Sequence, residues 1–61
     1  GAKALYPEIL SVVEGRLRPG ALVIADNADF SPDYLERVRA PASGYMSTPF
    51  GDDVELSMRL N

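Results

Sequence analysis

The sequence predicts a small α/β fold in which a helix, a strand, a second helix and two further strands follow one another, the last strand being antiparallel. Residues 21–25 form an unbroken apolar run, which is typical of a strand buried on both faces, as in a parallel sheet covered by helices. Ser31-Pro32-Asp33 has the residue types of a helix start. Residues 54–60 alternate between apolar and polar side chains, which indicates a final strand.

The composition restricts the chain to one small globular domain. Its 61 residues are 46% apolar and 25% charged, which is typical of a globular rather than a disordered chain. A chain of this length buries only about 60% of its unfolded surface, so its margin of stability is small. It contains neither Cys nor His, which excludes disulfides and histidine-based metal cages as stabilising features.

Charge and hydropathy exclude two classes of partner. The net charge of −3, from 6 basic and 9 acidic residues, argues against a surface for nucleic acid or for anionic membranes. No apolar run approaches the roughly 20 residues of a membrane span, and no signal-peptide pattern opens the chain. We therefore expect a cytoplasmic protein without nucleic-acid or membrane partners. The chain begins at Gly1 rather than Met, which indicates processing or a fragment.

The first helix is predicted over residues 5–17. Pro7 is tolerated only in a first helical turn, so the regular helix is expected to begin near Tyr6 or Pro7. Pro19-Gly20 then ends the helix and turns the chain into a strand at residues 21–26. The apolar side chains that recur at helical spacing and form the buried stripe are Leu5, Ile9, Val12, Val13 and Leu17.

The second helix is predicted to begin after Ser31, whose hydroxyl can cap free amide groups, and to end before Pro41. Arg37 and Arg39 are expected to lie on its solvated face. Its buried stripe is expected to consist of Tyr34, Leu35 and Val38.

The last two strands are predicted to form an antiparallel hairpin. Tyr45 to Phe50 and Val54 to Leu60 flank Gly51-Asp52-Asp53, which has the residue types of a tight turn. Pro49 makes the first of these strands an edge strand or marks its end. The apolar residues of the second strand, Met58 among them, are expected to face the core.

The predicted strand at residues 21–26 lacks the neighbouring strands and helices that it needs. A strand buried on both faces requires neighbours at its edges and helices on both faces. Only the hairpin is available as a neighbour. We therefore expect residues 1–61 to be the carboxyl-terminal portion of a larger α/β domain.

Five strings support a family resemblance: Lys3-Ala4-Leu5-Tyr6-Pro7, Leu17-Arg18-Pro19-Gly20, Val23-Ile24-Ala25-Asp26-Asn27, residues 33–39 and residues 54–60. In this order they resemble the second half of small-molecule O-methyltransferases that use S-adenosylmethionine. The resemblance is closest to the divalent-metal-dependent group that is similar to catechol O-methyltransferase. It covers nearly the whole chain.

The resemblance implies a Rossmann-like methyltransferase sheet. Residues 21–26 would be its strand five, Tyr45 to Phe50 its strand six, and Val54 to Leu60 a reversed strand seven inserted beside strand five. It also implies that residues 1–61 lack the amino-terminal half of the domain, with the glycine-rich turn and the ribose-binding acid that hold the cofactor. The fragment alone is therefore expected to be inactive and to bind S-adenosylmethionine poorly.

Asp26 and Asn27 are the candidate metal ligands. They supply a carboxylate and an amide oxygen directly after the apolar strand, where open α/β sheets place ligands, and such oxygens suit a hard divalent cation. By the resemblance they match two of the family's three protein ligands for a cation, expected to be magnesium. The third ligand, an Asp, would lie before Gly1. Alternatively, both residues serve the turn, since Asp and Asn satisfy turn backbone and tolerate positive φ.

Lys3 is the candidate catalytic residue. By the resemblance it matches the family's lysine base, which takes the proton of the substrate hydroxyl. A lysine can act in this way only if burial or nearby positive charge lowers its pKa. The alternative is a solvated lysine near a chain end. The remaining acidic candidates, Asp29, Asp52 and Asp53, are expected to be loop and turn residues. The alternatives are a further polar wall of the site for Asp29 and a surface calcium site for Asp52 and Asp53.

Two functions are compatible with these features. The first is metal-assisted transfer of a methyl group from S-adenosylmethionine to a hydroxyl of a small phenolic or catechol-like substrate. It requires the rest of the methyltransferase domain as a partner. The second is a non-catalytic fragment that self-associates through an exposed strand edge, since bare edges pair readily. We expect a homo-oligomer.

Overall fold

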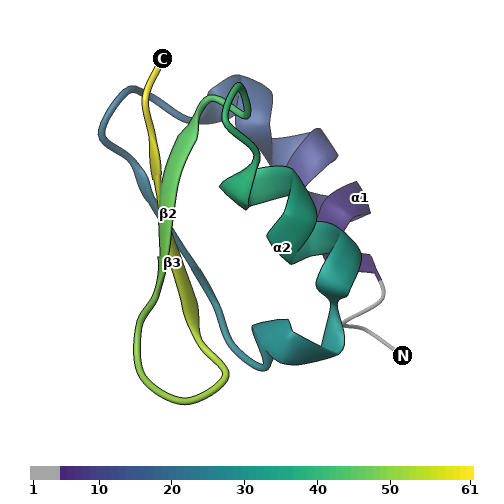
Figure 1. Ribbon diagram of the computed structural model, residues 1–61. Coiled ribbons are helices and arrows are strands. Elements are labelled where there is room, and N and C mark those ends of the chain that lie inside the picture. The colour runs from purple at the N-terminus through teal and green to yellow at the C-terminus, as the bar shows by residue number, and fades with distance from the viewer. Residues whose placement is uncertain (1–4) are drawn as a thin grey trace.

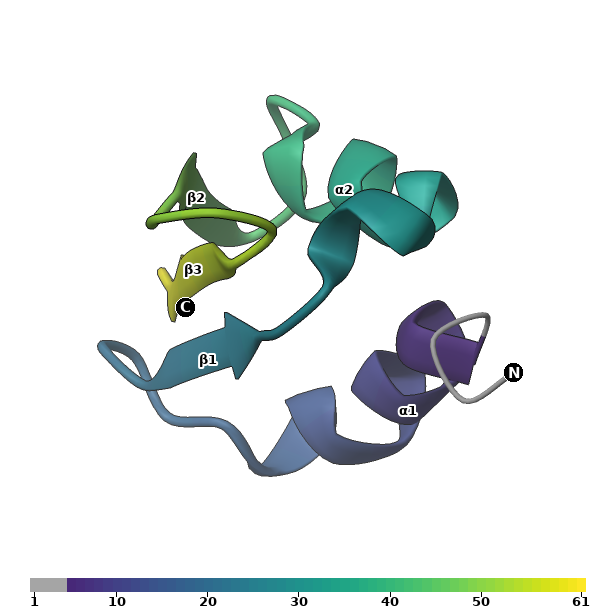
Figure 2. The ribbon, with the colours of Figure 1, turned by 90° about the horizontal axis from the view of Figure 1, so that it is seen from below.

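The computed structural model describes residues 5–61, in which two helices cover one face of a three-stranded sheet (Figures 1 and 2). The predicted order of helices and strands is confirmed. Short 3-10 turns follow α1 and β1, at Glu14–Arg16 and Ala28–Phe30. The main elements are α1 (Tyr6–Val13), β1 (Leu22–Ala25), α2 (Pro32–Arg39), β2 (Tyr45–Pro49) and β3 (Glu55–Arg59).

The sheet has the strand order β1-β3-β2, and β3 is antiparallel to both of its neighbours. The strands β1 and β2 therefore run parallel to each other with the last strand between them. Ser57 marks the middle of the sheet, because it pairs with Val23 of β1 and with Ser47 of β2. The predicted hairpin is confirmed. Its turn is closed by the Phe50 amide, which donates to the Val54 carbonyl at 2.9 Å.

The element boundaries follow local chemistry. Pro7 lies in the first turn of α1 as predicted, but the regular helix ends at Val13 rather than Leu17. Gly15 explains the early end, because glycine weakens a helix interior by about 1 kcal/mol relative to alanine. The strand β1 ends at Ala25, and the chain turns at Asn27 with a φ of 56°.

The prediction that residues 21–26 are buried on both faces is wrong for the described part of the chain. Both helices lie on the same side of the sheet (Figure 2). As a result, Leu22 and Ile24 are 61% and 66% exposed, whereas Ala25 is buried beneath the helices. An unbroken apolar run gives no information on how many faces of a strand are covered within one chain.

The predicted alternation in β3 is present, but the side that faces the helices is the polar one. Glu55 is 1% exposed and Ser57 is fully buried, whereas the apolar Leu56 and Met58 are only partly buried. The expectation that Met58 faces the core is therefore wrong. The buried apolar residues between the sheet and the helices are Leu10, Ala25, Ala28, Tyr34, Val38 and Tyr45.

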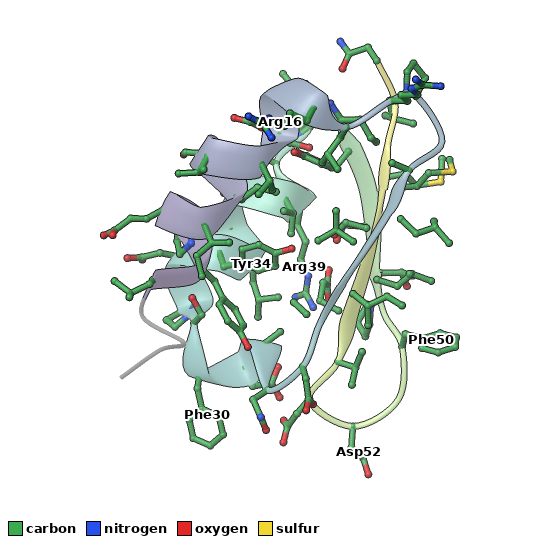
Figure 3. All side chains as sticks on the ribbon, turned by 180° about the vertical axis from the view of Figure 1, so that it is seen from behind. Arg16, Phe30, Tyr34, Arg39, Phe50 and Asp52 are labelled. Carbon is green, nitrogen blue, oxygen red and sulfur yellow. The ribbon has the colours of Figure 1, made fainter. Side chains whose placement is uncertain are left out.

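The buried Glu55 carboxylate is held by charge-assisted hydrogen bonds. Arg39 donates from Nε to Oε2 at 2.8 Å and from Nη2 to Oε1 at 2.6 Å. Ser47 donates to Oε2 at 2.7 Å, and its hydroxyl lies 2.6 Å from that of Ser57. Arg39 is exposed, as expected for a helix face, but its guanidinium also links α2 to the central strand (Figure 3).

Arg37, also expected on the solvated face, is only partly exposed and joins the two helices. Its guanidinium donates to the Pro7 carbonyl and the Ser11 hydroxyl, both at 2.7 Å. It also donates to Oε2 of Glu14 at 2.6 Å. One arginine with three acceptors thus ties α1 and the turn that follows it to α2.

Glu14 also connects the helices to the sheet. Its Oε1 accepts a hydrogen bond from the Tyr45 hydroxyl at 3.0 Å and lies 3.7 Å from Nη1 of Arg59. The Arg59 guanidinium lies over the Tyr45 ring, 4.9 Å from its centroid. Gly44 leaves room for this arginine, since a Cβ there would lie 2.9 Å from Nη1.

Folding stability is expected to fall in acid because of Glu55. The Arg39 hydrogen bonds, assisted by that of Ser47, lower the pKa of the Glu55 carboxyl against the effect of burial. A lowered pKa in the folded state gives stability that is present above the unfolded value of about 4.3 and lost as the pH falls through the folded value. Urea denaturation measured from neutral to acid pH checks this. Glu55→Gln is expected to flatten the dependence, and an unchanged profile would contradict the assignment.

Removal of Arg39 is expected to destabilise the fold strongly. Arg39→Ala leaves the Glu55 charge buried without its main partner, which costs about 2–3 kcal/mol, since water replaces the half-exposed guanidinium in part. Chemical denaturation followed by circular dichroism measures the loss. Arg16→Ala is the control, because Arg16 is exposed and surface substitutions usually change stability by less than about 0.5 kcal/mol. Equal effects of the two substitutions would disprove the structural role of Arg39.

Candidate functional site

Asp26 and Asn27, the predicted metal ligands, lie at the carboxyl end of β1. Asn27 has left-handed backbone geometry with a φ of 56°, and its backbone N–H donates to Oδ1 of Asp26 at 2.9 Å. The Tyr6 hydroxyl donates to the Asp26 carbonyl at 2.9 Å, so α1 helps to hold the end of the strand. The turn role that the sequence offered as the alternative is thus present. It leaves the exposed carboxylate of Asp26 open to solvent.

The hairpin turn lies beside this end of β1. The Ala28 amide donates to the Asp53 carbonyl at 2.7 Å and so joins the two loops. The neighbouring Asp29 carboxyl, together with the weaker effects of the Asp52 and Asp26 charges, raises the pKa of the Asp53 carboxyl. We call these four aspartates the acidic end (Asp26, Asp29, Asp52 and Asp53).

Asp29 follows the predicted ligand pair closely in the chain, whereas no local pattern connects Asp53 with that pair. The missing information was the strand order, because β3 begins where β1 ends only if these two strands are antiparallel neighbours. The register pairs Ala25 with Glu55, which brings the residues that precede Glu55 next to those that follow Ala25. The resemblance implies this pairing, with a reversed strand seven beside strand five, but only the register shows which aspartates it brings together.

The donor set of the acidic end suits a hard cation but does not complete a site. Within residues 5–61, no three His, Cys, Asp or Glu side chains are arranged to hold a metal ion. Asp26 and Asn27 offer a carboxylate and an amide oxygen, which are ligands that Mg²⁺ and Ca²⁺ accept. Lys3, the predicted base, lies outside the described residues.

A groove runs between α1 and β1 next to this end. It has a volume of about 180 Å³, comparable with the engineered apolar cavity of about 150 Å³ that binds benzene. Tyr6 and Tyr34 meet in it edge to face, with ring centroids 5.7 Å apart. Burial raises the pKa of the Tyr34 hydroxyl. The groove is lined by Tyr6, Ile9, Leu10, Val13, Val23, Ile24, Ala25 and Tyr34.

Comparisons with protein-family models, with curated proteins and with solved structures find no match for this chain. A functional interpretation therefore depends on the geometry of the described residues and on the family resemblance of the sequence. Over residues 5–61, none of the helices combines the length and the apolar composition that crossing a bilayer requires.

The charge repulsion at the acidic end predicts that Asp53→Asn stabilises the fold at neutral pH. A raised pKa in the folded state means that the ionised carboxylate is disfavoured there, so removal of the charge raises the free energy of unfolding. Asparagine also tolerates the φ of 57° at this position. The gain should vanish as the pH falls through the folded pKa, because the aspartate is then neutral as well. Thermal unfolding at several pH values measures it.

Glu36→Gln is the matched control for this substitution, because it removes one negative charge from an exposed position on α2 outside the acidic end. The control is expected to change the melting temperature less than Asp53→Asn does. Equal gains from the two variants would show that the net charge, and not the carboxylate cluster, is responsible.

Proposed function

We propose that the chain forms the carboxyl-terminal portion of an S-adenosylmethionine-dependent O-methyltransferase domain. The full domain would transfer a methyl group to a hydroxyl of a small phenolic or catechol-like substrate with the help of a divalent cation, magnesium. The strand order is the observation that supports this proposal. A reversed last strand, β3, lies beside β1, as the resemblance implies for strands seven and five.

This order is informative because it is not the default for such a sequence. Successive strands joined by a helical crossover are usually neighbours in a sheet. Here α2 connects β1 to β2, yet the two strands are separated by the strand that comes last in the chain. The predicted family has the same inserted strand, so a general α/β pattern alone does not account for the agreement.

The proposed chemistry assigns roles to three residues. Asp26 and Asn27 would hold the cation, which when bound lowers the pKa of the substrate hydroxyl and orients it. The backbone around Asp26 is fixed by Tyr6 and by the turn at Asn27, so the carboxylate starts from a defined position. Lys3 would take the hydroxyl proton. The groups that bind S-adenosylmethionine would come from the rest of the domain.

Among residues 5–61, no strand pairs with the second edge of β1. This open edge supports the addition of a further strand from the rest of the domain. Ala21 and Arg59 are hydrogen-bonded across the β1–β3 pair at 2.8 Å. Backbone groups alternate in an antiparallel pair, so those of Leu22 and Ile24 point away from β3 to the open edge. The groove beside this edge is apolar. The rest of the methyltransferase domain would cover both features.

The proposal predicts that Asp26→Ala lowers methyl transfer by at least about 10–100-fold, which is the usual cost of removing a residue that only supports a metal ligand. The assay uses the chain joined to its native upstream sequence, with labelled S-adenosylmethionine, a catechol and Mg²⁺. Asn27→Ala and Lys3→Met are expected to lower the rate as well. Glu36→Gln, on the exposed side of α2, should retain it. An Asp26→Ala variant with full turnover, or no transfer by the unsubstituted protein, would refute the proposal.

A second candidate is a non-catalytic module that self-associates through its exposed strand edge. The observation that favours it is the contrast between the two sheet edges. Pro49 interrupts the donors of β2, whereas β1 contains neither proline nor charge at its open edge. Slow hydrogen exchange at the amides of Leu22 and Ile24 in the isolated chain would indicate edge pairing, whereas fast exchange would exclude it.

A further inference from the structure

One face of the sheet is left uncovered by residues 5–61 and is apolar, and we call it the outer face. The register aligns Leu22 with Met58 and Met46, and Ile24 with Leu56 and Thr48. Phe50 extends this surface and points away from the helix layer (Figure 3). The most exposed members, between 50% and 66% accessible, are Leu22, Ile24, Met46, Phe50 and Leu60.

We propose that a second copy of the chain packs on this outer face, so that two sheets form a sandwich with the helices on the outside. At about 200 Å² for a fully exposed large side chain, the five most exposed residues offer about 600 Å² per copy. Two copies would bury about 1,200 Å², the lower end of the range for specific interfaces. A contiguous apolar surface of this size is characteristic of interaction sites.

The outer face carries no charge that association would bury. All six positions that the register places on it are uncharged. The charged side chains of the strands, Glu55 and Arg59, lie on the opposite face beneath the helices. Association therefore avoids the desolvation penalty of unpaired ions, and the surface is complementary to itself in the way that a twofold contact requires.

The charge distribution selects the orientation of the second copy. The acidic end lies where β1 ends, whereas the exposed Arg16 and Arg18 precede β1. Figure 3 shows Arg16 and Asp52 at opposite ends of the molecule. A twofold axis that lies between the two sheets and runs perpendicular to the strands places the acidic end of one copy beside Arg16 and Arg18 of the other. Antiparallel packing is thus favoured, because parallel packing would bring two acidic ends together.

The register, exposure and charge of the outer face support this proposal, and the methyltransferase assignment does not. Under that assignment, helices of the larger domain would be expected on this face. The predicted metal ligands lie at the end of β1, and the groove lies mostly on the α1 side, so face-to-face packing covers Ile24 but no other residue of the groove lining within residues 5–61. The competing occupant of the outer face is another part of a larger domain. In that case the 61-residue chain would have no preference for its own copy.

Sedimentation equilibrium of the chain tests the proposal. We expect twice the mass of the single chain at about 100 µM, since standard interfaces of about 1,600 Å² reach micromolar affinity or better and one of about 1,200 Å² lies at the weaker end of the range. Met46→Lys should give the single-chain mass with an unchanged circular dichroism spectrum. Phe30→Lys is the control, because Phe30 is 70% exposed but lies away from the outer face (Figure 3). A single-chain mass for the unsubstituted protein, or a dimer in the Met46→Lys variant, would overturn the proposal.

Cross-linking tests the orientation and does not require any variant to dissociate. The chain contains no Cys, so a single introduced cysteine reports one position. In antiparallel packing Met58→Cys, near the middle of the central strand, lies close to its own copy. Leu60→Cys, beyond the end of that strand, lies far from its copy. A short bismaleimide should therefore link the first variant and not the second. Linking of neither or of both would contradict the antiparallel sandwich.

Discussion

The fold depends on the ion pair between Arg39 and Glu55, buried on the Glu55 side. An uncompensated ion inside a protein costs several kcal/mol, so β3 can occupy the centre of the sheet only if α2 supplies the arginine. Ser47 of β2 satisfies a further acceptor position of the same carboxylate. One buried charge therefore holds together three elements that are distant in the sequence, α2, β2 and β3. The small apolar core needs this support, because a chain of 61 residues buries little surface.

The existence and order of the elements could be predicted because their signals are local. Pro19-Gly20 and Ser31-Pro32 act through backbone geometry that each residue brings with it. The buried side of β3 could not be predicted in the same way. Alternation defines two faces without selecting one, and hydrophobicity favours Leu56 and Met58. The structure selects the opposite side, because Glu55 finds its partner on a helix 16 residues earlier in the chain.

The candidate site shows the same division between local and long-range information. That Asp26 and Asn27 follow a strand could be predicted from the apolar run before them. That Asp29 and Asp53 approach them depends on the strand order, which no short stretch encodes. The turn role and the proposed ligand role of the pair are compatible, since the turn uses one oxygen of Asp26. A cation would also relieve the repulsion that raises the pKa of Asp53.

Because the polar side of the sheet faces the helices and the apolar side faces outward, the chain presents two adjoining surfaces for association. The open edge of β1 and its groove suit a neighbouring strand, whereas the outer face suits a second sheet. Ile24 belongs to both surfaces, because it lines the groove and lies on the outer face. Met46 belongs only to the outer face, on the far strand of the sheet. The rest of a methyltransferase domain and a second copy therefore meet at Ile24, and substitutions at Met46 separate the two modes of association.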